Sequence, residues 1–421
     1  MLGLLVAAGA TLASSPDAAD VVIVNTCAFI QPAIEEALDH LLSLADLKRR
    51  GVRALICAGC LPQRFAGDLA AELPEVDAFL GPGEVENIVA VVAQALAGRG
   101  GLHVSEPNFV GSSALPRVSF GPPWRSTVKI ADGCSHRCTF CTIPSIRGPF
   151  RSRLADDVAA EVEALLDGGA CEICLVAQDS CGYLTDLGLA DGLPALLHRL
   201  SPIVGSDRWL RIQYLHPDRL TSALIDAMLS VEAVVPYFDL PFQHAAAHVL
   251  RLMGRTGSRS SYEALIASIR DRQPDAAIRA TFIAGFPGET DEDFHDLLGF
   301  VGDMEADHAA VFPYWPEDGT PAARLPERVS DPEVRARHDE LVATAASASQ
   351  ARGERFVGRT MRVLVETAMG EGTYEGRTFR DAPEVDGVVR LTSPEPLDLG
   401  AFTDATITAA EVTDLTAVAA R

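Results

Sequence analysis

The stretch Asp132-Gly-Cys-Ser-His-Arg-Cys-Thr-Phe-Cys141 places three cysteines, Cys134, Cys138 and Cys141, in one short segment. An apolar run with β-strand character precedes it directly. Three thiolates on one loop can bind three irons of a cubane cluster and leave the fourth iron open for another ligand. The alternative is a zinc site, which needs a fourth ligand, and His136 is the only one nearby. The spacing therefore predicts an iron–sulfur cluster in a loop at the end of a strand.

Outward from this loop, apolar strand candidates alternate with amphipathic helices, and a helix over Asp331–Arg352 closes the region. Six such units predict a parallel sheet in an incomplete (β/α)6 barrel, with the chemistry on loops that follow the carboxyl ends of the strands. The expected strands are Thr127–Ala131, Glu172–Ala177, Trp209–Tyr214, Val234–Leu240, Arg279–Ala284 and Ala309–Tyr314.

The regions on either side predict two further domains, which makes the fold class α/β multidomain. Short apolar runs at Val21–Asn25 and Ala54–Ile56 flank a helical pattern over Pro32–Arg50 and predict a small α/β domain. The Gly-, Ser- and Pro-containing stretch Gly100–Pro123 is the expected linker. Alternating short runs near the carboxyl terminus predict a small all-β barrel. The expected domains are residues 1–110, 120–352 and 353–421.

Composition limits the possible functions. The 421 residues carry a formal net charge of −23, which disfavours nonspecific binding of nucleic-acid phosphates. No stretch approaches the roughly 20 apolar residues that cross a bilayer, so we expect a cytoplasmic protein with no membrane contact. The nine cysteines are an odd number, and a cytoplasmic chain keeps them reduced, which makes metal or cluster binding their expected use.

The cysteine loop and the six βα units resemble the radical S-adenosylmethionine (SAM) superfamily. Val24–Ile30 and Gly59–Arg64 resemble the amino-terminal domain of its methylthiotransferases, and Phe379–Gly387 resembles their TRAM domain. The resemblance implies two 4Fe-4S clusters and S-adenosyl-L-methionine as cofactors. Cys134, Cys138 and Cys141 would hold the cluster that generates a 5′-deoxyadenosyl radical, and no other catalytic residue is assigned.

The resemblance also implies an auxiliary cluster, for which Cys27 and Cys60 match the second and third cysteine ligands. The first, in a Gly-Cys-x-Lys-Asn loop after an opening strand, has no counterpart, and Met1–Leu5 looks like the helix that follows that loop. We therefore expect the first strand to be missing and the auxiliary cluster to be depleted or labile. Cys57 could replace the missing ligand, although strand alternation favours a buried cysteine. The three remaining cysteines are expected to be structural: Cys171, Cys174 and Cys181.

Further residues at strand ends are expected to line the pocket. The turn after the Arg279–Ala284 strand is either a SAM-side loop of the family or a simple glycine turn, and Thr290 and Asp293 are placed as a capping box. Three arginines beside the cluster loop either grip an anionic group of the substrate or cofactor or form a solvated basic face. The cofactor candidates are Phe140, Gln178, Asp179, Gly285, Gly288 and Glu289, and the substrate candidates are Arg147, Arg151 and Arg153.

Two branches of the family compete for the substrate. Cys141–Arg153 and Ala382–Gly387 resemble the RimO type, which methylthiolates the β-carbon of an aspartate in a small-subunit ribosomal protein of the uS12 kind. The acidic charge also suits a basic ribosomal protein partner, with nucleic-acid contact secondary and an external electron donor required. The alternatives are a MiaB-type enzyme that modifies an adenosine of transfer RNA, and an inactive ribosome-associated relative.

Overall fold

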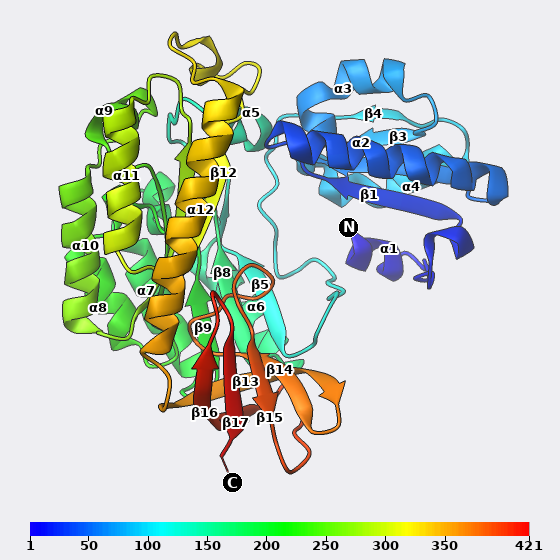
Figure 1. The fold of residues 1–421 in the computed structure, drawn as a ribbon. Coiled ribbons are helices and arrows are strands. Elements are labelled where there is room, and N and C mark those ends of the chain that lie inside the picture. Colours follow the sequence, from blue (N-terminus) through cyan, green and yellow to red (C-terminus); the bar gives the residue numbers. More distant parts are fainter. Residues whose placement is uncertain (421) are drawn as a thin grey trace. The chain divides into compact units, whose positions relative to one another are not determined.

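The computed structural model describes residues 1–420 and divides into two compact units (Figure 1). Unit 1 contains Met1–Ser119, Ala131–Arg153 and Trp315–Ala323, and unit 2 contains Phe120–Ile130, Leu154–Tyr314 and the chain from Arg324 onward. The predicted domain boundaries follow chain order instead and stay a prediction. Within residues 1–420, no helix is long and apolar enough to cross a membrane.

Unit 1 is built on a four-stranded parallel sheet in the order β1-β2-β3-β4. Alternate residues of the central strand point to opposite faces. Leu55 and Cys57 pack under α2 and α3, whereas Ile56 packs towards α4. The elements are α1 (Leu2–Ala7), η1 (Pro16–Ala18), β1 (Val21–Thr26), α2 (Gln31–Ala45), η2 (Asp46–Arg50), β2 (Ala54–Gly59), α3 (Cys60–Glu72), β3 (Ala78–Leu80), η3 (Pro82–Asn87), α4 (Ile88–Leu96), β4 (Gly101–His103), β6 (Ala131–Asp132), α5 (Ile143–Arg147) and β7 (Arg151–Ser152).

One expectation for this unit is wrong. The sequence predicts a linker over Gly100–Pro123, but Gly101–His103 forms β4 and pairs with β3. The approach is close at its start, because a Cβ on Gly100 would lie 1.7 Å from the carbonyl oxygen of Asp77. Gly100 contributes to the linker-like composition of this stretch, but its lack of a side chain is what allows the chain to join the sheet edge.

Unit 2 contains the six predicted parallel strands as two three-stranded sheets, β5-β8-β9 and β10-β11-β12, connected by an isolated bridge between Leu210 and Val234. The predicted fourth strand, Val234–Leu240, is shifted, since β10 starts after Pro236, which has no N–H to donate. The strands are β5 (Arg125–Lys129), β8 (Glu172–Val176), β9 (Trp209–Ile212), β10 (Tyr237–Gln243), β11 (Ala277–Ala284) and β12 (His308–Pro313).

Helices follow the strands and lie along the outside of these sheets, as expected for an incomplete (β/α)6 barrel (Figure 1). They are α6 (Ala155–Asp167), η4 (Ser180–Gly182), η5 (Thr185–Leu187), α7 (Gly192–Val204), η6 (Pro217–Arg219), α8 (Ser222–Ser230), α9 (Ala247–Leu252), α10 (Arg259–Arg272), α11 (Asp291–Asp303) and α12 (Asp331–Glu354), and η7 (Ala322–Arg324) precedes the last of them.

The carboxyl-terminal strands form a closed all-β barrel in the order β13-β14-β15-β17-β16, so this part of the predicted fold class is also confirmed. Its apolar interior is formed by alternating residues such as Val363, Val365 and Ile407. The strands are β13 (Thr360–Gly370), β14 (Thr373–Arg377), β15 (Val389–Thr392), β16 (Phe402–Ala410) and β17 (Leu415–Ala419).

Buried ion pairs join this small barrel to the amino ends of the parallel strands. Glu172, the first residue of β8, lies 2.7 Å from Arg211 Nε and 2.5 Å from Arg377 Nη2, and all three side chains are at most 2% exposed. His308, the first residue of β12, lies 3.1 Å from Asp381. We call these five residues the carboxyl-terminal seam. The seam therefore lies at the amino ends of the strands, whereas βα folds place their chemistry at the carboxyl ends.

Candidate functional site

The loop with the three predicted cluster ligands belongs to unit 1 and is closed at its base by the antiparallel pair β6 and β7. Gly133 has φ +78°, and a Cβ there would lie 2.2 Å from the carbonyl oxygen of Pro149, so only glycine fits. Cys134 N donates to the carbonyl of Gly148 at 3.1 Å. The side chains of the three loop cysteines and of Phe140 are half-buried, within reach of solvent.

The two predicted auxiliary ligands lie at the carboxyl edge of the small sheet. Cys27 follows β1 and Cys60 follows β2, and the preceding residues Thr26 and Gly59 are paired in register. Gly59 has φ +106°, and a Cβ on it would lie 2.5 Å from the carbonyl oxygen of Thr26. The glycine therefore lets the chain turn sharply out of the sheet. Cys27 is exposed and Cys60 is 8% exposed.

Arg147, at the end of α5, connects the cysteine loop to this edge. Burial raises the pKa of the Cys60 thiol, and the charge of Arg147 and a hydrogen bond from it partly offset that rise. The nearby charges of Cys27 and Asp132 raise this pKa slightly further. Arg147 Nη1 also lies 3.5 Å from Asp132 Oδ2. We call Cys27, Cys60, Asp132 and Arg147 the cysteine edge. All four belong to one compact unit.

Other contacts inside unit 1 fix the loop in place. Thr142 Oγ1 donates to the carbonyl of Phe29 at 3.2 Å, and Ile146 packs in the core under α2 and α3. Ala322 N donates to the carbonyl of Thr139 at 2.9 Å. The segments 131–153 and 315–323 therefore complete the support around Cys27 and Cys60.

The two other predicted substrate arginines are held by this chain. Arg151 donates to the carbonyls of Pro149 at 2.6 Å and Arg147 at 3.0 Å, which stabilises the loop. Arg153 is 5% exposed. Because these groups are buried or occupied, they do not form a solvated basic face. Their contact with a substrate stays a prediction.

The predicted residues of unit 2 follow β8 and β11. Asp179 is 1% exposed and lies 2.8 Å from Arg219 Nη1. Gln178 is half-buried, and its Oε1 is buried without a hydrogen-bond partner within residues 1–420. An unsatisfied buried oxygen is costly, so Gln178 keeps an acceptor for a ligand contact.

The glycine turn after β11 is tied together by Glu289. Its Oε2 accepts hydrogen bonds from Gly285 N at 3.0 Å and Phe286 N at 3.3 Å, and its Oε1 lies 2.8 Å from Arg337 Nη1. Both carboxylate oxygens are thus used within the chain, which favours a role in shaping the turn. The predicted capping box follows directly in the sequence and is confirmed, since Thr290 and Asp293 cap the start of α11 reciprocally.

The glycines of that turn have positive φ, +74° at Gly285 and +85° at Gly288. A Cβ on the first would lie 2.5 Å from Val334 Cγ2, and on the second 2.7 Å from Leu252 Cδ1. Both glycines are therefore required by packing within the chain. Binding of a cofactor by them, or by Phe140, Gln178, Asp179 or Glu289, stays a prediction.

Two residues that the sequence reasoning passed over lie at the carboxyl ends of β9 and β10. Tyr214 and Gln243 have φ of +59° and +71°, which is uncommon for residues with side chains and is often found at functional sites. Tyr214 N donates to Asp239 Oδ2 at 2.9 Å. No local sequence signal marks left-handed backbone at a tyrosine or a glutamine.

The remaining cysteines are consistent with structural roles. Cys57 is fully buried in the core under α2 and α3, and burial raises the pKa of its thiol to about 12, with a small opposing effect from Thr26. Cys174 in β8 is 1% exposed, and burial likewise raises its pKa to about 12. Cys181 also has a raised pKa through burial, and Cys171 Sγ lies 3.1 Å from the carbonyl of Gly400.

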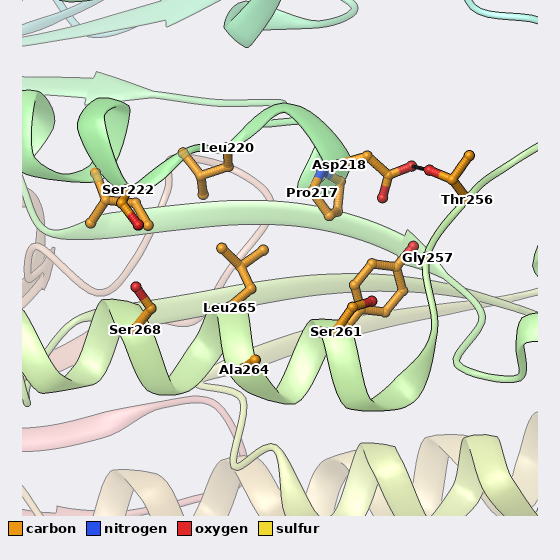
Figure 2. Close-up of a pocket in the computed structure, with 12 residues that line it drawn as sticks. Pro217, Asp218, Leu220, Ser222, Thr256, Gly257, Ser261, Ala264, Leu265 and Ser268 are labelled. Atoms are coloured by element: carbon orange, nitrogen blue, oxygen red, sulfur yellow. Dashed lines mark hydrogen bonds between the residues drawn. The ribbon is translucent and has the colours of Figure 1, made fainter.

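A hollow of about 450 Å³ lies between η6, α8 and α10 on the helical side of unit 2 (Figure 2). Its lining includes hydroxyl groups, and Thr256 Oγ1 donates to Asp218 Oδ2 at 2.8 Å. None of the predicted ligands lines it. The hollow therefore has no role among those predicted from the sequence.

The donor set fits an iron–sulfur cluster in chemical type. Thiolates are the usual ligands of such clusters, and three cysteines on one loop match the number that leaves one iron open. Within residues 1–420, no three His, Cys, Asp or Glu side chains lie close enough together to form a ready metal site.

Family models match three successive parts of the chain. The radical SAM superfamily matches residues 128–301, the TRAM domain matches residues 357–419, and a family described as uncharacterized protein family UPF0004 matches residues 1–81. With the incomplete barrel and the cysteine loop, these matches define the class as a radical SAM protein with a TRAM barrel, as the sequence predicted.

Curated relatives narrow the class to one family. The chain is 42% identical to a protein of Heliobacterium modesticaldum, with 99% of this chain and 90% of the relative covered, and 42% identical to one of Desulforamulus reducens, with 99% and 94% covered. It is 43% identical to one of Thermotoga maritima, with 88% and 85% covered. Each relative is named ribosomal protein uS12 methylthiotransferase RimO. The chain belongs to this RimO family.

Solved structures support the fold. The radical S-adenosylmethionine methyltransferase TsrM from Kitasatospora setae, with cobalamin and a [4Fe-4S] cluster bound, has a TM-score of 0.55 at 16% identity and covers 72% of this chain and 63% of its own. TsrM with tryptophan substrate and a SAM analog also has a TM-score of 0.55, at 17% identity, and covers 78% of both chains. At this identity the likeness shows a shared fold alone.

Proposed function

We propose that this chain is an enzyme that methylthiolates the β-carbon of an aspartate in ribosomal protein uS12, using S-adenosyl-L-methionine. The geometric observation that carries the proposal is the gathering of both cysteine sets in unit 1, with Arg147 between them. A radical SAM enzyme of another kind needs only the loop cysteines. The similarity to RimO proteins, at 42% identity over 99% of this chain, supports the same activity.

The chain's own residues have distinct roles in this proposal. Cys134, Cys138 and Cys141 hold the first 4Fe-4S cluster, which supplies, when bound and reduced by an external donor, the electron that cleaves S-adenosyl-L-methionine. Gly133 and the β6–β7 pair hold the loop in shape. Gln178 offers an unsatisfied buried acceptor to a ligand at the carboxyl ends of the strands.

Cys27 and Cys60 contribute two ligands to a second, auxiliary 4Fe-4S cluster. The register of β1 and β2 places them at one edge, and the positive charge of Arg147 opposes the burial that disfavours a thiolate at Cys60. Arg147 in this proposal stabilises a sulfur ligand, which differs from the grip on a substrate anion expected from its sequence context.

The acidic balance favours a protein substrate over transfer RNA. The formal net charge is −23, and the segment from Arg355 to the carboxyl terminus, which includes the TRAM barrel, has 7 arginines, no lysine and 11 acidic residues. An RNA-binding barrel ordinarily presents an excess of basic groups. A basic ribosomal protein in the cytoplasm fits this surface better.

Mass spectrometry of the product tests the proposal. The anaerobically reconstituted protein is incubated with S-adenosyl-L-methionine, a sulfide source, a reductant and either purified uS12 or transfer RNA. We expect a methylthio group on one aspartate of uS12 and an unmodified transfer RNA. Modification of an adenosine instead would identify the MiaB-type activity. Absence of both products, in a protein that carries iron and cleaves S-adenosyl-L-methionine, would favour an inactive relative.

A further inference from the structure

Unit 1 has an apolar groove that none of the roles above uses. It lies between α2 and α3, has a volume of about 400 Å³ and is bounded at one end by Pro316–Asp318. The α2 side presents residues spaced three or four apart, which is one face of a helix. Its apolar lining consists of Ile34, Leu38, Leu42, Leu61, Phe65, Leu69 and Leu73.

The rim of the groove is acidic. Asp68, Glu72 and Asp318 are exposed and line it, and none of them makes an ion pair within residues 1–420. The basic residue in the lining, Arg64, is neutralised by Glu317, at 2.8 Å. The groove therefore combines an apolar floor with uncompensated negative charge at its edge. Lys and Arg side chains suit such a surface, because the aliphatic stem packs on the floor and the cation meets the rim.

The groove is continuous with the cysteine edge. Cys60 is the first residue of α3, and Leu61, the next residue, already lines the groove. Arg64 Nη1 donates to the carbonyl of Ala28, beside Cys27, at 2.9 Å. The helix is also kinked at Phe65, which has φ −131° and ψ 25°. A chain lying along the groove would therefore start within one helical turn of the thiols.

We propose that this groove docks a basic segment of the substrate ribosomal protein, with one or two apolar side chains on its floor. The inference rests on the proposed function and names its docking surface. Ribosomal proteins bind RNA phosphates and so carry lysine- and arginine-rich segments, which complement the rim. The volume admits a few side chains and excludes a folded domain, so the occupant is an extended or helical segment.

Binding of purified uS12 to the reconstituted full-length protein tests this inference by fluorescence anisotropy. The variant Asp68→Lys with Glu72→Lys reverses an acidic pair one helical turn apart on α3. Its matched control is Glu163→Lys with Asp167→Lys, an exposed pair with the same spacing on α6 of unit 2. Both double variants change the net charge equally, so long-range attraction is affected alike.

We expect the α3 variant to raise the Kd for uS12 by about tenfold or more and to make binding less dependent on salt. The Kd of the α6 control should stay within about twofold of that of the unmodified protein. Leu42→Ser, at a position that is 52% exposed, removes floor area and should weaken binding severalfold without unfolding the helix. Thermal unfolding and iron content establish that each variant is folded.

Equal weakening by the two double variants, or by neither, would overturn the groove as docking site while leaving the proposed function intact, provided that the unmodified protein binds and modifies uS12. Failure of the unmodified protein to bind uS12 would instead overturn the proposed function and this inference with it. A change of oligomeric state in the α3 variant, measured by analytical ultracentrifugation, would assign the groove to a second copy of the chain.

Discussion

The cysteine edge of unit 1 and the carboxyl-terminal seam of unit 2 both surround arginines with buried or half-buried partners, but the partners differ in kind. In the seam, Arg211 and Arg377 share the carboxylate of Glu172, and opposite charges are matched inside the protein. At the cysteine edge, Arg147 is shared between Asp132 and the thiol of Cys60, whose pKa stays raised because burial outweighs the arginine.

This difference indicates that the carboxyl-terminal seam is structural, whereas the cysteine edge is suited to bind a ligand. Burial alone would raise the pKa of Glu172, but Arg211 and Arg377 outweigh the effect of burial, and the pKa is lowered. The carboxylate is therefore ionised, and its negative charge is balanced by arginines within the protein. The thiol of Cys60 is only partly compensated, so a further positive partner would stabilise its thiolate. A buried charge that is fully matched specifies geometry, whereas a partly matched one leaves binding energy for a ligand.

The largest expected effect comes from removing a ligand of the cysteine loop. Cys134→Ala should abolish cleavage of S-adenosyl-L-methionine, by about 10³-fold or more, because the three thiols act as a unit. The measurement is 5′-deoxyadenosine formed after anaerobic reconstitution, with iron counted per chain. Cys174→Ala, which removes a buried thiol of β8, is the control and should retain the activity. Cleavage by the Cys134→Ala variant would refute the cluster assignment.

The next effect concerns the seam. Glu172→Ala leaves Arg211 and Arg377 buried without their shared carboxylate, and should reduce the free energy of unfolding of unit 2 by about 3–5 kcal/mol. Urea unfolding, followed by tryptophan fluorescence, measures the loss. Glu411→Ala is the matched control, because Glu411 pairs with Arg390 at the surface and is 63% exposed, and it should cost less than about 1 kcal/mol. Similar costs for both variants would mean that the seam is no more than a surface contact.

A third prediction concerns Arg147 itself. Arg147→Met removes the hydrogen bond to Cys60 and the ion pair to Asp132, and should weaken retention of iron against a chelator by about 10–100-fold, as for groups that support metal ligands. Arg147→Lys keeps the charge but not the guanidinium fork, so its iron retention should lie between those of Arg147→Met and the unmodified protein. Arg49→Met, at an exposed pair with Asp46, is the control. Unchanged iron retention in Arg147→Met would show that the arginine only stabilises the loop.

The smallest expected effect is a pH dependence of the seam. Burial lowers the pKa of His308, but Asp386 and Asp381 outweigh it, and the net direction is upward from 6.5. Its stabilisation is therefore fully present below about pH 6.5 and is lost as the pH rises through the higher value of the folded protein. Asp381 keeps its charge through this pH range, because its own pKa is lowered. Burial alone would raise the pKa of Asp381, but His308 and Arg380 lower it by more.

Thermal unfolding of His308→Gln against the unmodified protein measures this effect. The Tm difference should be about 2–4 °C at pH 6 and should shrink towards pH 9. The control is His338→Gln, since His338 pairs with Asp339, which is 80% exposed, and its Tm difference should be near zero at both pH values. A difference for His308→Gln that grows with pH would reverse the sign of the proposed linkage.

The sequence predicted the elements better than the contacts between them. Parallel strands are buried on both faces, so the run Ile173–Ala177 within the predicted strand Glu172–Ala177 is visible as a continuous apolar stretch. The capping box at Thr290 was visible because its two partners are three residues apart. The pairing of Glu289 with Arg337 spans 48 residues, and no local pattern marks it. For the same reason, the sequence showed Arg147 as one of three clustered arginines and not as the partner of Cys60.

Glu317 gives the chain an order of assembly. Its carboxylate accepts a hydrogen bond from Gln31 N at 2.7 Å and pairs with Arg64, which in turn supports the carbonyl beside Cys27. The small sheet leaves the translating ribosome first, yet this clasp emerges only once residue 317 of 421 has been made. The support beside Cys27 is therefore complete only late in synthesis, and we predict that any metal bound by Cys27 and Cys60 is held stably only from that point on.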